Sequence, residues 1–169
     1  MILPTVTITT MVKAARALIR TLAIVAVASM LAACIYDAPI TAQPTREVDP
    51  RLIGDWTSAD GKEQVKVRKL DRRTYVIDYN GELFQAWHSD LDGRSLVSVQ
   101  DLERPERKFS YISYELSPDG KRLRALSVSN KTIPDKAVHS PRDAQAALRR
   151  HSSDPKLFNE EPLELQRKR

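Results

Sequence analysis

The sequence predicts a mainly β fold: an antiparallel up-and-down meander that closes into a small eight-stranded barrel, with one short C-terminal helix before the last strand. Four of the five glycines directly follow an aspartate or an asparagine, and such pairs are favoured in tight hairpins because both positions must reach positive φ. The runs between these pairs are short and rich in β-branched, aromatic and aliphatic residues, which is typical of strands. Closing eight antiparallel strands into a barrel removes the exposed edges of an open sheet.

The turns and strands alternate regularly along the chain. The turn pairs are Asp60-Gly61, Asn80-Gly81, Asp92-Gly93 and Asp119-Gly120. The first predicted strand contains Gly54 and Trp56. The other seven predicted strands are residues 64–68, 75–79, 83–87, 96–99, 109–116, 123–128 and 163–167. Because each strand follows the previous one after a short turn, we expect sequential neighbours to pair.

One helix is expected between the last two strands. Ser140 suits the N-cap, Pro141 the first helical position, and Asp143 lies near the positive end of the helix. Ala144, Ala147 and Leu148 form one narrow apolar face, and Asp154-Pro155 is expected to end the helix. This stripe predicts a short helix that packs on the sheet, because a membrane-surface helix needs a larger apolar face.

The N-terminal region has the organisation of an export signal. Lys13, Arg16 and Arg20 precede a charge-free run from Thr21 to Ala33, and no acidic residue occurs upstream. The run is shorter than the about 20 residues of a membrane-spanning helix, so a permanent anchor helix is the weaker alternative. The compact basic stretch from Met11 onward favours Met11 as the true start. We therefore expect residues 1–33 to be a signal peptide, 34–49 a flexible tether that begins with Cys34, and 50–169 the barrel domain.

Charge argues against a nucleic-acid partner. The whole chain has 27 Lys and Arg against 22 Asp and Glu, but removal of the signal lowers the formal charge from +5 to +2. The remaining charges alternate in sign, as in residues 103–108, whereas a nucleic-acid binder clusters basic residues on one face. We expect a solvated surface of mixed charge.

The segment Leu31-Ala32-Ala33-Cys34 resembles the lipobox of bacterial lipoprotein signal peptides. The resemblance implies that Cys34 is acylated on its sulfur, becomes the mature N-terminus and is acylated again. Two or three acyl chains attach a protein stably to a membrane. The residue after Cys34 is Ile35 rather than aspartate, which implies transfer to the outer membrane. We expect the domain to face the periplasm, but the residues themselves do not determine the side. The structural alternative for a single cysteine is a buried thiol.

The segment Gly54-Asp55-Trp56 is similar to the Gly-x-Trp signature of lipocalins and related calycin barrels. The resemblance implies that Gly54 and Trp56 belong to the closed end of the barrel, where the tryptophan packs across the opening. It also implies that a basic residue late in the barrel, here Arg167, lies over the tryptophan ring in a cation–π contact. The predicted strands are shorter than those of typical lipocalins, and the helix precedes the last strand. The resemblance is therefore to a minimal lipocalin-like lipoprotein.

An eight-stranded barrel is either filled by its own side chains or holds one small ligand. The candidates for ligand-lining residues are Tyr75, Ile77, Tyr79, Trp87 and Tyr114, and Leu83 is also expected to face inward. The bulky aromatic residues favour a filled interior. Tyrosine hydroxyls among apolar residues are also the composition of an amphipathic ligand pocket, although the hydroxyls could equally lie at the barrel rim.

Catalysis has little support in the sequence. His88, His139 and His151 lie far apart without metal-ligand spacing, and we expect His88, which is close to a turn, at the surface. Ser140 is explained by its capping role, and no glycine-rich phosphate loop occurs. We expect no enzymatic activity, no metal and no cofactor.

Two functions of different class remain. The first is a membrane-anchored, non-catalytic envelope lipoprotein that acts by interaction with another envelope protein. The alternative is a binding module that takes a small amphipathic or lipid ligand into the barrel. An open, apolar barrel favours binding of a ligand, whereas a packed interior with an exposed aromatic patch favours binding of a protein.

Overall fold

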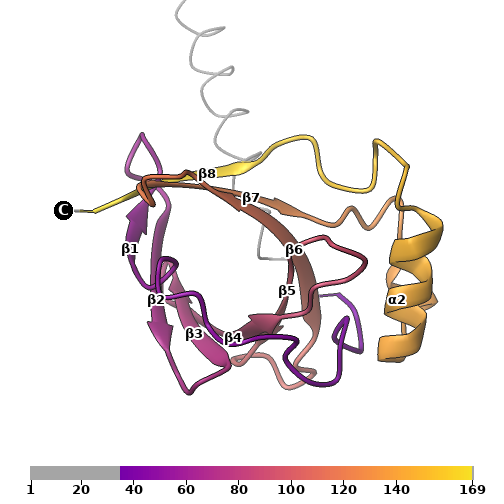
Figure 1. The fold of residues 1–169 in the computed structure, drawn as a ribbon. Coiled ribbons are helices and arrows are strands. Elements are labelled where there is room, and N and C mark those ends of the chain that lie inside the picture. The colour runs from indigo at the N-terminus through magenta and orange to yellow at the C-terminus, as the bar shows by residue number, and fades with distance from the viewer. Residues whose placement is uncertain (1–34, 169) are drawn as a thin grey trace, which may run out of the picture. The chain divides into compact units, whose positions relative to one another are not determined.

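A computed structural model describes residues 35–168 and confirms the predicted fold class (Figure 1). Eight antiparallel strands pair in sequence order, and β8 pairs with β1 through Trp56 and Arg167, which closes the barrel. The strands are β1 Gly54–Thr57, β2 Gln64–Lys69, β3 Thr74–Tyr79, β4 Glu82–His88, β5 Leu96–Asp101, β6 Phe109–Leu116, β7 Arg122–Ser127 and β8 Leu163–Arg167. Closure leaves no sheet edge exposed along the barrel.

The four turn pairs divide into two kinds. Asn80-Gly81 and Asp92-Gly93 have positive φ at both positions, as the sequence predicts for two-residue hairpins. At Asp60-Gly61 and Asp119-Gly120 only the glycine has positive φ. These two loops are longer, closed by backbone hydrogen bonds from Ser58 to Glu63 and from Ser117 to Arg122, so the aspartate keeps an ordinary backbone conformation and the prediction for it is wrong.

The strand pairing determines which side chains face the lumen, the space inside the barrel. Trp56 is opposite Val65, and Val65 is opposite Tyr79, so these three residues share the inner face. Lys66 and Asp78 are paired on the outer face, where their side chains form an ion pair of 2.9 Å. Alternation along each strand extends this assignment around the barrel.

The connection between β7 and β8 contains a short 3₁₀-helix, η1 (Asp135–Ala137), and the predicted helix, α2 (Pro141–Arg150). The Ser140 side chain accepts a hydrogen bond from the Asp143 backbone N–H, which confirms the predicted N-cap. Ala144, Ala147 and Leu148 are buried, as predicted, but α2 ends at Arg150, before Asp154-Pro155. In the described part of the chain, neither helix is long and apolar enough to cross a bilayer.

A hydrophobic cluster lies outside the barrel, between its wall and the segments that cover it. Helix α2 lies beside the barrel wall in Figure 1, and its buried face belongs to this cluster. The strands β4, β5 and β6 contribute the outward-facing Trp87, Leu96, Phe109 and Tyr111. Both faces of this part of the sheet are therefore buried.

The N-terminal segment, residues 35–53, also covers the barrel, and the expectation of a flexible tether up to residue 49 is wrong. Tyr36 and Ile40 are buried in the outer cluster. The Tyr36 ring stacks on Tyr111 with 4.3 Å between ring centroids, and the Ile40 backbone N–H donates to the Ser98 hydroxyl at 3.0 Å. These contacts to distant parts of the chain order a stretch that has no regular secondary structure.

Candidate functional site: the lumen and the closed end of the barrel

The topology divides the turns between two ends of the barrel. One end has the β1–β2, β3–β4 and β5–β6 turns, and we call it the mouth. The other end has the β2–β3, β4–β5 and β6–β7 turns. The N-terminal segment reaches β1 at this second end, and its Leu52 carbonyl accepts a hydrogen bond from the Trp56 indole at 2.9 Å. We call this second end the closed end.

Trp56 and Arg167 meet at the closed end, in the contact that the Gly-x-Trp resemblance implied. Trp56 is fully buried, and the Arg167 guanidinium carbon lies 4.3 Å from the centre of its ring, within the range of a cation–π contact. The guanidinium also donates to the carbonyl of Ile53 at 2.8 Å, of Gly120 at 3.0 Å, and of Arg51. Arg167 thus ties the N-terminal segment to the β6–β7 turn over the tryptophan.

Gly54 is required by the position of Arg167. A Cβ atom added at Gly54 would lie against the Arg167 guanidinium, closer than real Cβ atoms approach other atoms. The φ angle of Gly54 is +150°, a backbone conformation that residues other than glycine rarely adopt. The glycine therefore makes room for the arginine that packs on Trp56.

Buried polar side chains gather at the closed end beside this contact. The Tyr75 hydroxyl lies 2.7 Å from Nε2 of His88 and accepts a hydrogen bond from the Asp49 backbone N–H at 2.5 Å. Arg46 donates to the Tyr114 hydroxyl at 2.8 Å and forms an ion pair of 2.6 Å with Asp90. Residues from β3, β4 and β6 are thereby joined to the N-terminal segment, which closes this end of the lumen.

His88 is fully buried, so its predicted place at the surface is wrong. Burial, followed by the positive charge of Arg46, lowers the pKa of His88 to about 4, so the ring is neutral at neutral pH. The Tyr75 hydroxyl already accepts a hydrogen bond from the Asp49 backbone N–H. Its one proton is therefore free to be donated to Nε2 of His88. We therefore assign the ring proton to Nδ1, which has no hydrogen-bond partner in the described part of the chain.

The inner wall of the barrel is apolar, and its burial is uneven. On β2, β4 and β5 the inward-facing Val65, Val67, Phe84, Ala86, Val97 and Val99 are buried. The inward-facing Ile77, Ile112, Leu123, Ala125 and Leu163 are only partly buried, whereas Tyr75 and Tyr79 on β3 and Leu165 on β8 also face inward and are buried. The five partly buried apolar side chains therefore keep some surface that the rest of the described chain does not cover.

Four of the five predicted ligand-lining residues face the lumen. Tyr75 and Tyr114 lie at the closed end, and Ile77 lies at mid-strand. Tyr79 lies near the mouth, where its hydroxyl donates to the Glu63 carboxylate at 2.5 Å. Burial, together with this carboxylate, raises the pKa of Tyr79. The tyrosine hydroxyls are therefore placed near the two ends of the lumen rather than at its centre.

Trp87 and Leu83 were assigned to the wrong face. In β4 the inward-facing residues are Phe84, Ala86 and His88, so Trp87 points outward, where its ring meets Phe109 edge-on at 5.7 Å. Its indole N–H donates to the Thr41 carbonyl at 3.2 Å. Leu83 also points outward and is 44% exposed. The error arose because the C-terminal half of β4, Ala86–His88, is buried on both faces, so that its alternation does not reveal which face is inside.

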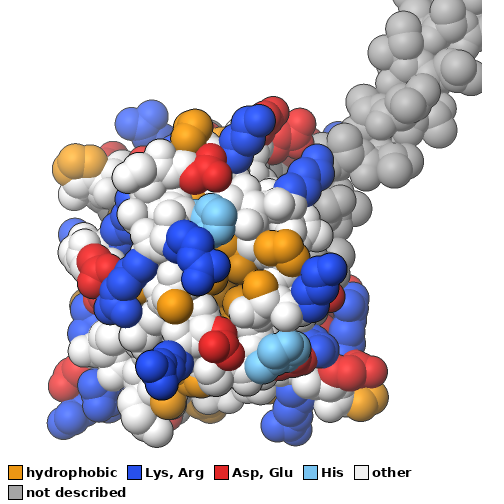
Figure 2. All heavy atoms as spheres, turned by 90° about the vertical axis from the view of Figure 1, so that its right-hand side faces the viewer, with side chains coloured by type: hydrophobic (Ala, Val, Ile, Leu, Met, Phe, Trp, Pro, Cys, Tyr) orange, Lys and Arg blue, Asp and Glu red, His pale blue; other side chains and the backbone are white. Residues whose placement is uncertain are grey.

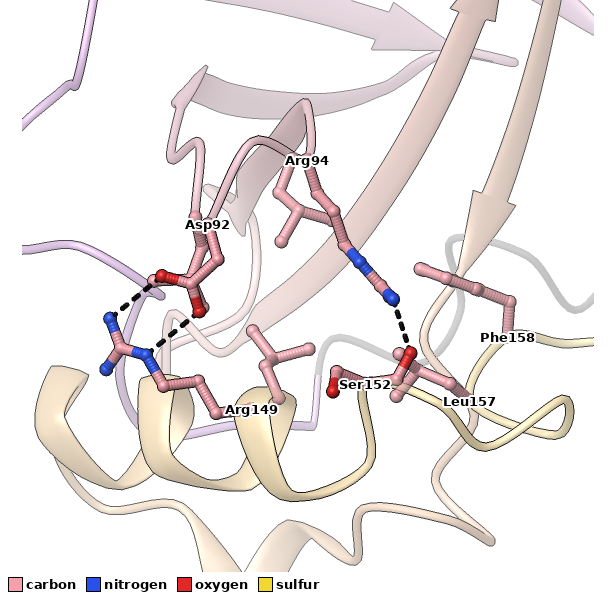
Figure 3. A pocket seen from close by; sticks show the side chains of 9 residues that line it. Asp92, Arg94, Arg149, Ser152, Leu157 and Phe158 are labelled. Carbon is pink, nitrogen blue, oxygen red and sulfur yellow. Dashed lines mark hydrogen bonds and ion pairs between the residues drawn. The ribbon is translucent and has the colours of Figure 1, made fainter.

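A small hollow lies outside the barrel, between the β4–β5 turn and α2 (Figure 3). Its cavity volume is only about 30 Å³, and its apolar lining includes Leu96, Leu148 and Leu157. Asp92 pairs with Arg149 at 3.0 Å, and Arg94 donates to the Ser152 carbonyl. These polar contacts connect the β4–β5 turn with α2 and the residues after it. The hollow is therefore part of the packing interface between these two elements.

The described residues contain no group of three or more His, Cys, Asp or Glu side chains that could hold a metal ion. Cys34 and the predicted signal peptide before it lie outside the described residues. No protein-family model, curated protein or solved structure matches this chain.

Proposed function

We propose that the chain is a minimal lipocalin-like lipoprotein of the bacterial outer membrane, held by acylated Cys34, whose lumen binds a small amphipathic or lipid ligand. The observation that carries the ligand is the partly exposed inner wall formed by residues such as Ile112, Leu123 and Leu163. Apolar walls with a few convergent polar groups are typical of small-molecule sites. Here the polar groups are those of the closed end. The proposed role is non-catalytic, because those groups are engaged in holding the N-terminal segment.

Support for the lipocalin-like assignment is the agreement between motif and geometry. The glycine and the tryptophan of the Gly-x-Trp segment lie at the closed end, and Arg167 covers the tryptophan ring. Support for the anchor is the sequence alone, through the lipobox-like segment that ends in Cys34. Replacement Cys34→Ser is expected to release the protein from the membrane fraction and to leave the free energy of unfolding unchanged.

Interaction with another envelope protein is the second candidate function. Figure 2 shows the face of the molecule that carries α2, where apolar side chains gather among Lys and Arg side chains. The hollow beside α2 belongs to this region, and its Leu148 and Leu157 are 4% and 2% exposed. The exposed large hydrophobic residues among the described ones are Leu70 and Leu83, not an aromatic patch. This candidate therefore ranks below binding in the lumen.

The lumen is tested by filling it. Ala125 faces inward opposite Tyr114, whereas the next residue, Leu126, faces outward. We expect the domain of residues 35–169 to bind oleate in a calorimetric titration. The variant Ala125→Phe is expected to weaken that binding by at least about tenfold, a loss of about 1.4 kcal/mol. The matched control Leu126→Phe is expected to leave the binding unchanged.

The free energy of unfolding of Ala125→Phe provides a second test. Overpacking a filled core typically costs about 1–3 kcal/mol, so a lumen with free space predicts a smaller cost for Ala125→Phe. Absence of oleate binding by the unmodified domain, or equal binding by the two variants, would contradict the proposed site.

A further inference from the structure

The N-terminal segment begins at the mouth of the barrel. The backbone N–H groups of Ile35 and Tyr36 donate to the Phe109 carbonyl at 3.0 and 3.1 Å, and the Phe109 N–H donates back to the Tyr36 carbonyl at 2.8 Å. Phe109 is the first residue of β6 and directly follows the β5–β6 turn, which is one of the mouth turns. The segment thus begins beside the mouth and later closes the opposite end.

Several contacts fix this starting point. Tyr36 is 1% exposed, and its hydroxyl donates to the Ile133 carbonyl at 2.9 Å. Its neighbour Asp37 forms ion pairs with Lys108 and with His139, the latter at 2.9 Å. A backbone that is hydrogen-bonded, buried and ion-paired within three residues has no freedom to act as a linker.

The length of chain between the anchor and this fixed point is minimal. Cys34 precedes Ile35 directly, and consecutive Cα atoms are about 3.8 Å apart. Acyl chains on Cys34 would therefore leave the protein beside the mouth. A flexible tether would let the domain turn freely, whereas a single residue restricts it.

We infer that the anchor holds the barrel with its mouth toward the bilayer, so that the lumen receives a membrane-resident, single-chain lipid directly from the membrane surface. This inference rests on the lipid anchor and the lumen of the proposed function. Leu163, the first residue of β8, faces the lumen at the mouth and is partly exposed. The closed end, by contrast, is crossed by the N-terminal segment. We therefore assign entry of the ligand to the mouth.

The orientation is tested on the full, lipidated protein in phospholipid vesicles that contain a headgroup-labelled nitroxide lipid. Because the Cys34 sulfur is acylated, an introduced cysteine is the only free thiol. Glu106→Cys places a fluorophore at the mouth, and Lys121→Cys places one at the closed end; both positions are exposed. We expect quenching by the nitroxide to be several-fold stronger at position 106 than at position 121.

The matched control adds a Gly/Ser linker of about 12 residues between Cys34 and Ile35, which spans about 20 Å on average. The linker is expected to abolish the difference between the two positions. Equal quenching at both positions without the linker, stronger quenching at 121, or a difference that persists with the linker overturns the inference. Failure of the protein to attach to vesicles is a separate result that refutes the lipid anchor itself.

Discussion

His88 is expected to make the stability of the domain depend on pH between about 6.5 and 4. Its pKa is lowered to about 4 by burial and by Arg46, whereas an unfolded histidine has a pKa of about 6.5. The unfolded state therefore binds a proton before the folded state does, and acidification favours unfolding. At about 1.4 kcal/mol per pH unit, the loss reaches about 3 kcal/mol at pH 4. Above pH 6.5 the ring is neutral in both states and the effect vanishes.

The assay is urea unfolding of the domain of residues 35–169 at a series of pH values from 7.5 to 4. The control variant His88→Gln retains a polar group for the Tyr75 hydroxyl and cannot acquire the imidazolium charge. Carboxylates with lowered pKa, such as Asp71 and Asp78, lose their contribution at lower pH in both proteins, so the difference between the two curves isolates His88. Parallel curves for the two proteins would refute the burial of a neutral His88.

Three further predictions concern packing. Trp56→Ala is expected to lower the free energy of unfolding by about 3–5 kcal/mol, measured by urea unfolding, and a mild effect would refute its role in closing the barrel. Gly54→Ala is expected to destabilise by more than about 1 kcal/mol, and by less in an Arg167→Ser background, because the added methyl then has room; additive effects in this double-mutant cycle would contradict the contact. Ser140→Ala is expected to cost about 1 kcal/mol through loss of the α2 N-cap, and an unchanged thermal midpoint would contradict that cap.

The fold class was predictable because the turn residues carry strong local signals. Asn80-Gly81 adopts the positive φ angles that select a tight hairpin, and the strands on either side pair as expected. Ser140 and Pro141 mark the start of α2 through equally local chemistry. The pairing of Trp56 with Arg167, by contrast, joins the two ends of the domain and came from the family resemblance, not from periodicity.

The order of the N-terminal segment was not predictable from local patterns. Tyr36 and Ile40 lie in a stretch with prolines and polar residues, which is typical of a linker. Their partners, Phe109, Tyr111 and Ser98, are distant in sequence. The spaced apolar residues of this segment were the available signal, but only tertiary contacts decide whether such a segment packs or remains free.

The faces of β4 were ambiguous for a related reason. Phe84 and Trp87 lie on opposite faces of the strand, and both are buried. Alternation identifies the inner face only where the outer face meets solvent, and here α2 and the N-terminal segment cover the outer face. His88 was misplaced by the same error, since an inward Trp87 puts His88 outside.

Native mass spectrometry of the domain of residues 35–169, purified from the periplasm, tests the occupied lumen most directly. The range includes the N-terminal segment, because that segment closes the barrel and belongs to the fold. A lumen that binds a ligand predicts a bound amphiphile at a ratio of one per chain, identified after organic extraction, and its absence from Ala125→Phe. The mass of the bare chain alone, unchanged after addition of excess oleate, would contradict binding in the lumen.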